Sequence, residues 1–163
     1  MNAQRLNLFI VDDDPLMVTT LRNYLDNRFG SSLNTSIFYT GESALKKVDK
    51  DTNIVLLDYY LKNENGNEVL KSIKKINPKT EVIMLSSNED IGIAIDAFRN
   101  GATDYVVKGE KSWKKVSSIL LGIMTYPVRV MVREFGISKH IAIFLLIFLA
   151  MGIGLYIALR LSH

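Results

Sequence analysis

A short apolar segment that ends in an acid constrains the fold of this chain most strongly. Residues 53–58 read NIVLLD, with four consecutive aliphatic side chains followed by Asp58. An uninterrupted apolar run of this length is typical of a strand buried on both faces of a parallel sheet. Asp58 then lies at the carboxyl end of the strand, the edge at which ligands bind in open α/β sheets. A carboxylate at that edge is a catalytic group, a metal ligand or a helix cap.

Strands and helices are predicted to alternate over the first 124 residues. Such alternation is typical of a parallel sheet with helices on both faces, and right-handed crossovers make the sheet doubly wound. Pro127, which follows Tyr126, is expected to break the last helix of this series. The predicted strands are 6–11, 34–39, 53–58, 81–86 and 104–108, and the predicted helices are 15–29, 41–49, 68–76, 89–100 and 112–124.

The charge of the chain is unevenly distributed. The net charge is +3, but residues 109–163 carry seven Lys and Arg against two Asp and Glu, whereas residues 1–108 are slightly acidic. The basic excess therefore belongs to the tail, and the overall charge does not indicate a DNA-binding protein. The chain has no cysteine, which excludes disulfides, thiolate metal sites and a cysteine nucleophile.

Polar residues follow four of the five predicted strands: Asp12 and Asp13, Asp58, Ser86 and Lys108. Carboxylates that converge on one edge repel each other, so a divalent cation that prefers oxygen ligands, such as Mg²⁺, is the expected neutraliser. A lysine and a hydroxyl beside them are suited to hold phosphoryl oxygens. Taken singly, these residues are also compatible with solvated loop acids, a strand-end hydroxyl and a surface charge. Asp14, directly before Pro15, is predicted to cap a helix.

Five motifs, in order and at strand ends, carry a family resemblance: FIVDDD, IVLLD, Gly66 eight residues after Asp58, VIMLSS and GATDYVVK. On these motifs, residues 5–124 resemble the receiver domain of bacterial two-component response regulators. The resemblance implies a flavodoxin-like, doubly wound, five-stranded parallel sheet with the strand order 2-1-3-4-5.

The resemblance also implies a role for each matching residue. Asp58 would be the phosphoacceptor, and the metal ligands for Mg²⁺ would be Asp12, Asp13, Asp58 and the backbone carbonyl of Tyr60. Ser86 and Lys108 would contact the phosphoryl group, and Tyr105 would be an aromatic switch whose position follows Ser86. The phosphoryl donor would be a histidine kinase or a phosphotransfer protein.

Two positions depart from the family pattern. Lys62 and Gly109 stand where the family usually has proline. A cis bond before a non-proline residue costs about 3 kcal/mol, so we expect a trans bond between Lys108 and Gly109. These departures leave open a pseudo-receiver that acts as a scaffold without phosphorylation. A second alternative is an aspartyl-phosphate hydrolase, because such enzymes also place an acid after a first strand; its nucleophile would lie within 12–14.

The tail predicts attachment to a membrane. Residues 141–159 contain 19 residues without a charge, which as a helix span about 28 Å, close to the thickness of the hydrocarbon core. We expect a receiver domain over 1–125, a basic amphipathic linker over 126–140 and a transmembrane helix over 141–161. Positive charges before the helix place the receiver in the cytoplasm. The small residues Ala150, Gly154 and Ala158 share a helix face and suggest a homodimer.

Together these observations predict a membrane-anchored response regulator receiver, single-pass in the cytoplasmic membrane, that is phosphorylated on Asp58. It would signal through a phosphorylation-dependent protein–protein interaction with a downstream protein, without a DNA-binding output domain and without contact to nucleic acid. It would not be an enzyme beyond catalysing its own phosphorylation and dephosphorylation.

Overall fold

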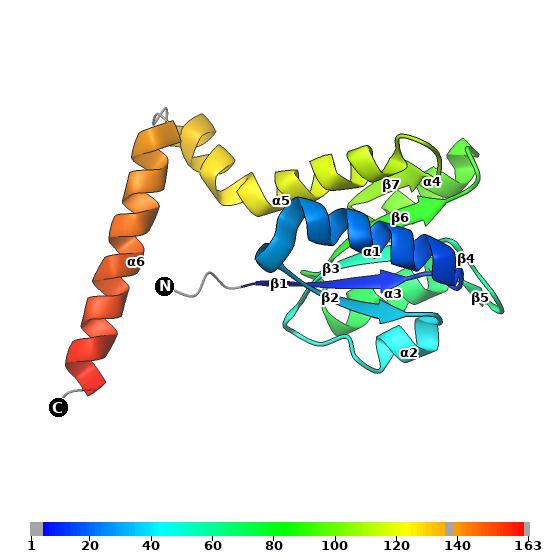
Figure 1. The fold of residues 1–163 in the computed structure, drawn as a ribbon, viewed down its shortest axis with the longest axis horizontal. Helices are drawn as coiled ribbons and strands as arrows, with labels where there is room; N and C mark the ends of the chain where they lie inside the picture. Colours follow the sequence, from blue (N-terminus) through cyan, green and yellow to red (C-terminus); the bar gives the residue numbers. More distant parts are fainter. Residues whose placement is uncertain (1–4, 136–138, 162–163) are drawn as a thin grey trace. The chain divides into compact units, whose positions relative to one another are not determined.

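The computed structural model of the protein describes residues 5–135 and 139–161. The chain divides into two compact units, residues 1–119 and residues 120–163. The first unit contains the five-stranded sheet (Figure 1). The predicted site residues, from Asp12 to Lys108, also fall within it. The second unit contains the later part of α5 (Ser112–Phe135) and α6 (Lys139–Leu161). Each unit is described by itself below.

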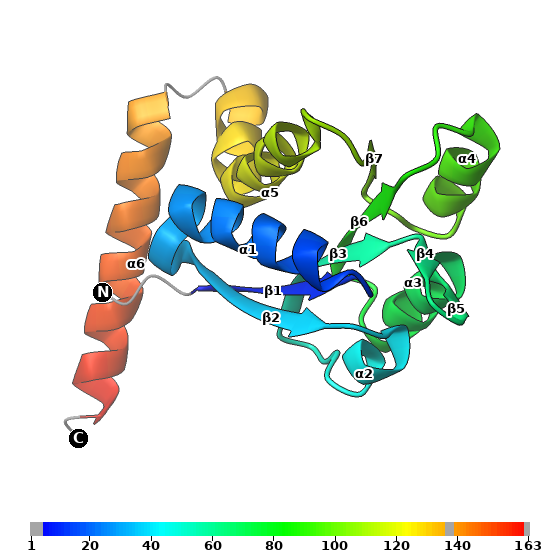
Figure 2. The same cartoon turned by 45° about the vertical axis from the view of Figure 1, so that its right-hand side comes forward.

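The first unit is built around a five-stranded sheet in which every neighbouring pair of strands is parallel. Its order is β2 (Leu33–Phe38), β1 (Leu6–Val11), β3 (Thr52–Asp58), β6 (Glu81–Ser86) and β7 (Asp104–Val107). With β6 and β7 as its fourth and fifth strands, the sheet confirms the predicted order 2-1-3-4-5. All five carboxyl ends therefore meet at one edge, as the parallel arrows of Figure 2 show.

Helices cover both faces of this sheet (Figures 1 and 2), and the central strand β3 is buried on both sides. In β3, Val55 and Leu57 belong to the core that contains side chains of α2, α3 and α4, while Ile54 and Leu56 are buried on the opposite face. This two-sided burial confirms the interpretation of the NIVLLD segment. The helices of the first unit are α1 (Pro15–Phe29), the 3₁₀ turn η1 (Gly30–Ser32), α2 (Gly41–Leu45), α3 (Gly66–Ile76), α4 (Ile91–Arg99) and the start of α5.

Local hydrogen bonds mark where α1 begins and where α2 ends. Asp14 caps α1 as predicted, because its Oδ1 accepts hydrogen bonds from the backbone N–H groups of Leu16 and Met17. The predicted helix over 41–49 ends earlier, at Leu45. Beyond it the chain tightens, with the N–H groups of both Lys47 and Val48 donating to the carbonyl of Ala44.

The segment after β3, in which neither a strand nor a helix was predicted, contains a small hairpin. β4 (Tyr60–Leu61) pairs with β5 (Glu64–Asn65) in an antiparallel arrangement. The turn between them has Asn63 at a φ of 95°, a region that asparagine tolerates better than most side chains. Lys62, which replaces the usual proline, is an exposed residue of this turn.

The second unit differs from the prediction at its first helix. α5 was expected to end before Pro127, but it continues to Phe135. Proline fixes φ near the helical value and removes only one backbone donor, so a helix can continue through it at a free-energy cost. The side chains of the predicted linker 126–140 lie outside the described residues, as does the chain itself at 136–138.

The predicted transmembrane segment forms α6, a helix of 23 residues. Across the residues that the structure describes, none of the helices is long and apolar enough to cross a membrane. The prediction of a transmembrane helix over 141–161 is therefore not supported by this part of the chain. Ala150 lies on α6, but the side-chain positions of Gly154 and Ala158 are outside the described residues, so their predicted shared face is not tested.

Gly66 fixes the course of the chain directly after the acidic strand end. A Cβ atom at this position would collide with the carbonyl oxygen of Asp58 and would lie 2.7 Å from the Cα of Tyr59. The N–H of Gly66 donates to the carbonyl of Tyr59 at 2.9 Å. The start of α3 thus packs on backbone atoms next to Asp58, and only glycine allows this approach.

We predict that Gly66→Ala destabilises the first unit by about 1–3 kcal/mol, because the added methyl group forces the backbone beside Asp58 to move. Urea denaturation followed by circular dichroism measures the change. Gly109→Ala is the control, since a Cβ there meets no atom within 4 Å. Equal stability losses in the two variants would contradict the steric explanation.

Candidate functional site

Three carboxylates meet at the carboxyl edge of the sheet. Asp12 directly follows β1, Asp13 follows Asp12, and Asp58 ends β3. Each of the three offers a carboxylate oxygen, and these oxygens lie within 4.8 Å of one another. Asp12 and Asp58 are buried, with 3% and 4% of their surfaces exposed, and Asp13 is half-buried. The structure thus brings together the three acids that the sequence predicted as a group.

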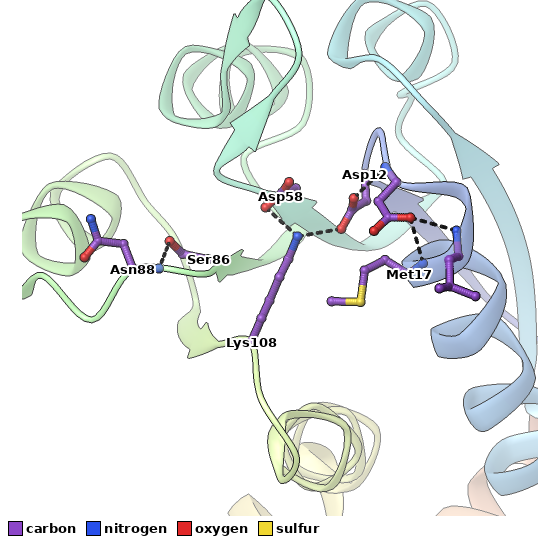
Figure 3. Close-up of polar contacts among 8 residues, drawn as sticks. Asp12, Met17, Asp58, Ser86, Asn88 and Lys108 are labelled. Atoms are coloured by element: carbon purple, nitrogen blue, oxygen red, sulfur yellow. Dashed lines mark hydrogen bonds and ion pairs between the residues drawn. The ribbon is translucent and has the colours of Figure 1, made fainter.

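Lys108 lies between the two buried acids (Figure 3). Its Nζ is 2.8 Å from Oδ2 of Asp12 and 2.9 Å from Oδ1 of Asp58. Lys108 directly follows β7, the edge strand of the sheet. Its distance to Asp12 and Asp58 therefore depends on the order of β1, β3, β6 and β7. The Oδ1 of Asp12 also accepts the N–H of Asp14 at 3.0 Å, which fixes the orientation of that carboxylate.

The charges of these groups are strongly coupled. Burial raises the pKa of Asp58, and the nearby charge of Asp12 adds to this effect, while Lys108 opposes it. Burial alone would lower the pKa of Lys108, but its hydrogen bonds and ion pairs with Asp12 and Asp58 outweigh burial and raise it. The lysine therefore stays charged, and one cation faces three carboxyl groups.

This donor set fits a hard divalent cation. Carboxylate oxygens are the ligands that Mg²⁺ prefers, and a cation at the three acids would neutralise the repulsion that Lys108 leaves unbalanced. Asp13 is the least buried of the three, so it is accessible to a cation from solvent. The carbonyl of Tyr60, which the sequence also named as a ligand, stays a prediction.

Ser86 is the last residue of β6, the strand next to β3. Asp58 pairs with Leu85, the residue that precedes Ser86. The carbonyl of Ser86 accepts the N–H of Lys108 at 2.7 Å, so the two predicted phosphoryl-contacting residues are joined through the backbone. The hydroxyl of Ser86 accepts the N–H of Asn88 at 3.1 Å (Figure 3). Ser86 is fully buried at the acidic edge, with its hydroxyl already held in place.

Tyr105, the predicted switch, lies inward on β7 with 7% of its surface exposed. Its hydroxyl donates to the carbonyl of Asn88 at 2.7 Å. Burial raises the pKa of Tyr105, so the phenol keeps its proton for this hydrogen bond. The sequence placed Tyr105 near Ser86 by resemblance, and the structure connects the two through Asn88.

The position of Gly109 does not distort the site. Among the described residues there is no cis peptide bond, so the bond between Lys108 and Gly109 is trans, as predicted. The amine of Lys108 reaches both acids all the same. Replacement of the usual proline by Gly109 is therefore compatible with the expected position of the lysine.

Two residues at this edge were not singled out by the sequence. Glu64 accepts the N–H groups of Gly41 and Glu42 at 2.5 and 2.9 Å, and so connects β5 to the start of α2. Asn88 contacts Ser86 and Tyr105, as described above, and also Tyr60 through its side chain. Neither residue belongs to a periodic pattern or to one of the quoted motifs, so only the folded arrangement reveals its contacts.

Comparisons with known proteins agree with this arrangement. Residues 8–118 match the family model of the response regulator receiver domain. The transcriptional regulatory protein ZraR of Klebsiella oxytoca is 31% identical over 109 residues, which cover 66% of this chain and 24% of that protein. The transcriptional regulatory protein MalR of Bacillus subtilis is 31% identical over 104 residues, which cover 63% of this chain and 44% of that protein. The chain thus spans less than half the length of these two relatives.

The solved structures give the same result. The response regulator domain of Thermotoga maritima CheB is 28% identical, with a TM-score of 0.61 over 75% of this chain and 96% of that chain. The family model covers more than half of the sequence, and it includes Asp12, Asp13, Asp58, Ser86 and Lys108. The chain therefore belongs to the family of response regulator receiver domains.

Proposed function

We propose that the chain accepts a phosphoryl group on Asp58 from a histidine kinase or a phosphotransfer protein. The observation that carries this proposal is the ion pair of Lys108 with the buried Asp58, beside two further acids. An Asp58 oxygen attacks the phosphorus of a phosphohistidine. The P–N bond breaks, its electron pair stays on the imidazole nitrogen, and Asp58 becomes an acyl phosphate.

The residues of the site divide this task. Lys108, already 2.9 Å from Asp58, is placed to hold an oxygen of the incoming phosphoryl group. Ser86 offers its hydroxyl proton to a second phosphoryl oxygen while its lone pair keeps the N–H of Asn88. Mg²⁺ bound by Asp12, Asp13 and Asp58 would neutralise charge on the phosphoryl oxygens. The chain then catalyses only its own phosphorylation and dephosphorylation.

The output is a change in protein–protein interaction. Tyr105 and the β6–α4 loop are connected to Ser86, so occupation of the site by a phosphoryl group changes the surface around α4. α4 exposes Ile91 and Phe98, apolar side chains suited to a protein partner. That the chain does not bind nucleic acid stays a prediction.

We predict that incubation with acetyl phosphate and Mg²⁺ adds the mass of one phosphoryl group to the intact protein. Asp58→Asn should abolish the gain, because an amide cannot act as the nucleophile, while Asp51→Asn at the surface should leave it unchanged. Intact-mass spectrometry measures the result. A wild-type chain that gains no mass, or an Asp58→Asn variant that gains as much as the wild type, would favour a pseudo-receiver that acts without phosphorylation.

A second prediction concerns the cation. Mg²⁺ should raise the melting temperature of the wild-type protein, since a ligand that binds only the folded state stabilises it. Asp13→Asn should need at least a tenfold higher Mg²⁺ concentration for the same rise in melting temperature, because one carboxylate ligand is lost. Asp14→Asn is the matched control, since asparagine also caps a helix. Differential scanning fluorimetry over a MgCl₂ titration checks it, and identical titrations for the two variants would count against the site.

We further propose that residues 141–161 attach the chain to the cytoplasmic membrane, with the receiver in the cytoplasm. Support comes from the 19 uncharged residues and from large apolar side chains that α6 exposes. Phe144, Phe148 and Met151 expose 65%, 68% and 62% of their surfaces. Apolar surface of this extent on a helix is typical of a membrane or protein contact. Self-association through Ala150, Gly154 and Ala158 belongs to the same proposal.

We predict that the full chain floats with phospholipid vesicles in a sucrose gradient. Phe144→Glu combined with Phe148→Glu should leave the protein in the dense fraction, because two charges in the hydrocarbon region cost several kcal/mol. Leu16→Glu, at an exposed apolar residue of α1, is the control and should still float. If the wild-type chain stays in the dense fraction, α6 is not a membrane anchor.

A further inference from the structure

Glu64, in the second strand of the β4–β5 hairpin, bonds to the start of α2. Its two carboxylate oxygens accept the backbone N–H groups of Gly41 at 2.5 Å and Glu42 at 2.9 Å. The first N–H groups of a helix have no partner within the helix. The third of them, from Ser43, bonds to the hydroxyl of Thr40 at 3.2 Å. Glu64 therefore completes the cap of α2 from a distant position in the sequence.

Gly41 provides the room for this carboxylate. A Cβ atom there would lie 3.1 and 3.2 Å from the two carboxylate oxygens of Glu64, and it would collide with the side chain of Val69 on α3. Across the hairpin, Glu64 pairs with Leu61, which is buried in the same core cluster as Val69. Glu64 itself is half-buried. Loss of its carboxylate would thus leave two N–H groups without their acceptor at the junction of the hairpin, α2 and α3.

The hairpin that Glu64 holds begins two residues after Asp58. Its first residue, Tyr60, forms a backbone hydrogen bond with the Asp58 carboxylate. Burial raises the pKa of Asp58, and this bond is one of the interactions that work against the rise. After the hairpin, the N–H of Gly66 donates to the carbonyl of Tyr59 at 2.9 Å. A shift of the hairpin would therefore displace the backbone groups next to Asp58.

A cavity of about 490 Å³ adjoins the contact between the hairpin and α2. It extends to Asp13, the most accessible of the three clustered acids, so the hairpin borders the acidic cluster at a second place. The residues that line the cavity include Asp13, Thr40 and Glu42 at the start of α2, and Lys62 and Glu64 of the hairpin.

We propose that Glu64 is a positioning residue for the cation site, which holds the segment after Asp58 in the arrangement that takes up Mg²⁺. This inference deepens the proposed function and rests on its cation site. Glu64 is not one of the proposed ligands. It acts through the hairpin, which begins beside Asp58 and borders the cavity at Asp13. Groups that orient metal ligands in this way affect metal affinity without contacting the metal.

The test uses the whole chain, with Mg²⁺ itself as the probe. Differential scanning fluorimetry gives, for each variant, the Mg²⁺ concentration that produces a given rise above its own melting temperature without Mg²⁺. Glu64→Met keeps a long side chain but has no oxygen to accept either N–H, so it should need about tenfold more Mg²⁺ than the wild type. Glu64→Gln keeps one acceptor oxygen and should need an intermediate concentration.

Two control variants separate positioning from charge and from general stability. Glu42→Gln removes an exposed carboxylate beside the same cavity but keeps the backbone N–H that Glu64 accepts. It should leave the Mg²⁺ requirement within about twofold of the wild type, because exposed charges are screened. Asp49→Ala removes a carboxylate that accepts the N–H of Asp51 at 2.9 Å and the hydroxyl of Thr52 at 3.0 Å, at the amino end of β3. It should lower the melting temperature and leave the Mg²⁺ requirement unchanged.

The outcomes distinguish this inference from the proposed function. A wild-type chain that responds to Mg²⁺, with both Glu64 variants responding at the same concentrations, overturns the inference alone. It is also overturned if Glu42→Gln or Asp49→Ala raises the requirement as much as Glu64→Gln, since charge or lost stability then explains the effect. If Glu64→Met does not fold, Glu64→Gln decides by the same criteria. A wild-type chain whose melting temperature does not respond to Mg²⁺ overturns the proposed cation site, and the inference with it.

Discussion

The amine of Lys108 between the carboxylates of Asp12 and Asp58 is the interaction on which the site depends. Two carboxylates buried at one edge of a sheet repel each other and lose hydration, so they require a cation close by. The lysine lies 96 residues from Asp12 in the sequence. Only a sheet in which β1, β3, β6 and β7 follow in this order, all parallel, brings the three groups together. The charge balance of the site therefore depends directly on the strand order of the sheet.

The chain after Asp58 is shaped to keep that acid at the strand end. Gly66 lets the start of α3 approach the backbone of Asp58 and Tyr59, and Glu64 bonds the β4–β5 hairpin to the first N–H groups of α2. These contacts use backbone atoms and one carboxylate. The turn therefore keeps its shape with Lys62 at the usual proline position, because Asn63 adopts the positive φ that the hairpin requires.

The sequence predicted the sheet and the acidic cluster because each leaves a local signal. Buried strands are short apolar runs, and Asp12, Asp58, Ser86 and Lys108 come directly at or after their ends. The β4–β5 hairpin has two residues in each strand, too few for any period, and the bonds of Glu64 and Asn88 depend on the positions of distant elements. At Pro127 the local signal was strong but wrong. Proline predicted the end of a helix, yet α5 continues past it to Phe135.

Ser86 connects the chemistry of the site to the surface of the domain. On one side its carbonyl holds the backbone of Lys108, and on the other its hydroxyl holds Asn88, which bonds Tyr105 and Tyr60. Under the proposed function, a phosphoryl group that recruits the hydroxyl proton of Ser86 and the amine of Lys108 would therefore act on Ser86 from two sides. The side chain of Asn88 also accepts the N–H of Asp90, the cap of α4, so a displacement of the loop 86–88 would be passed on to the start of that helix.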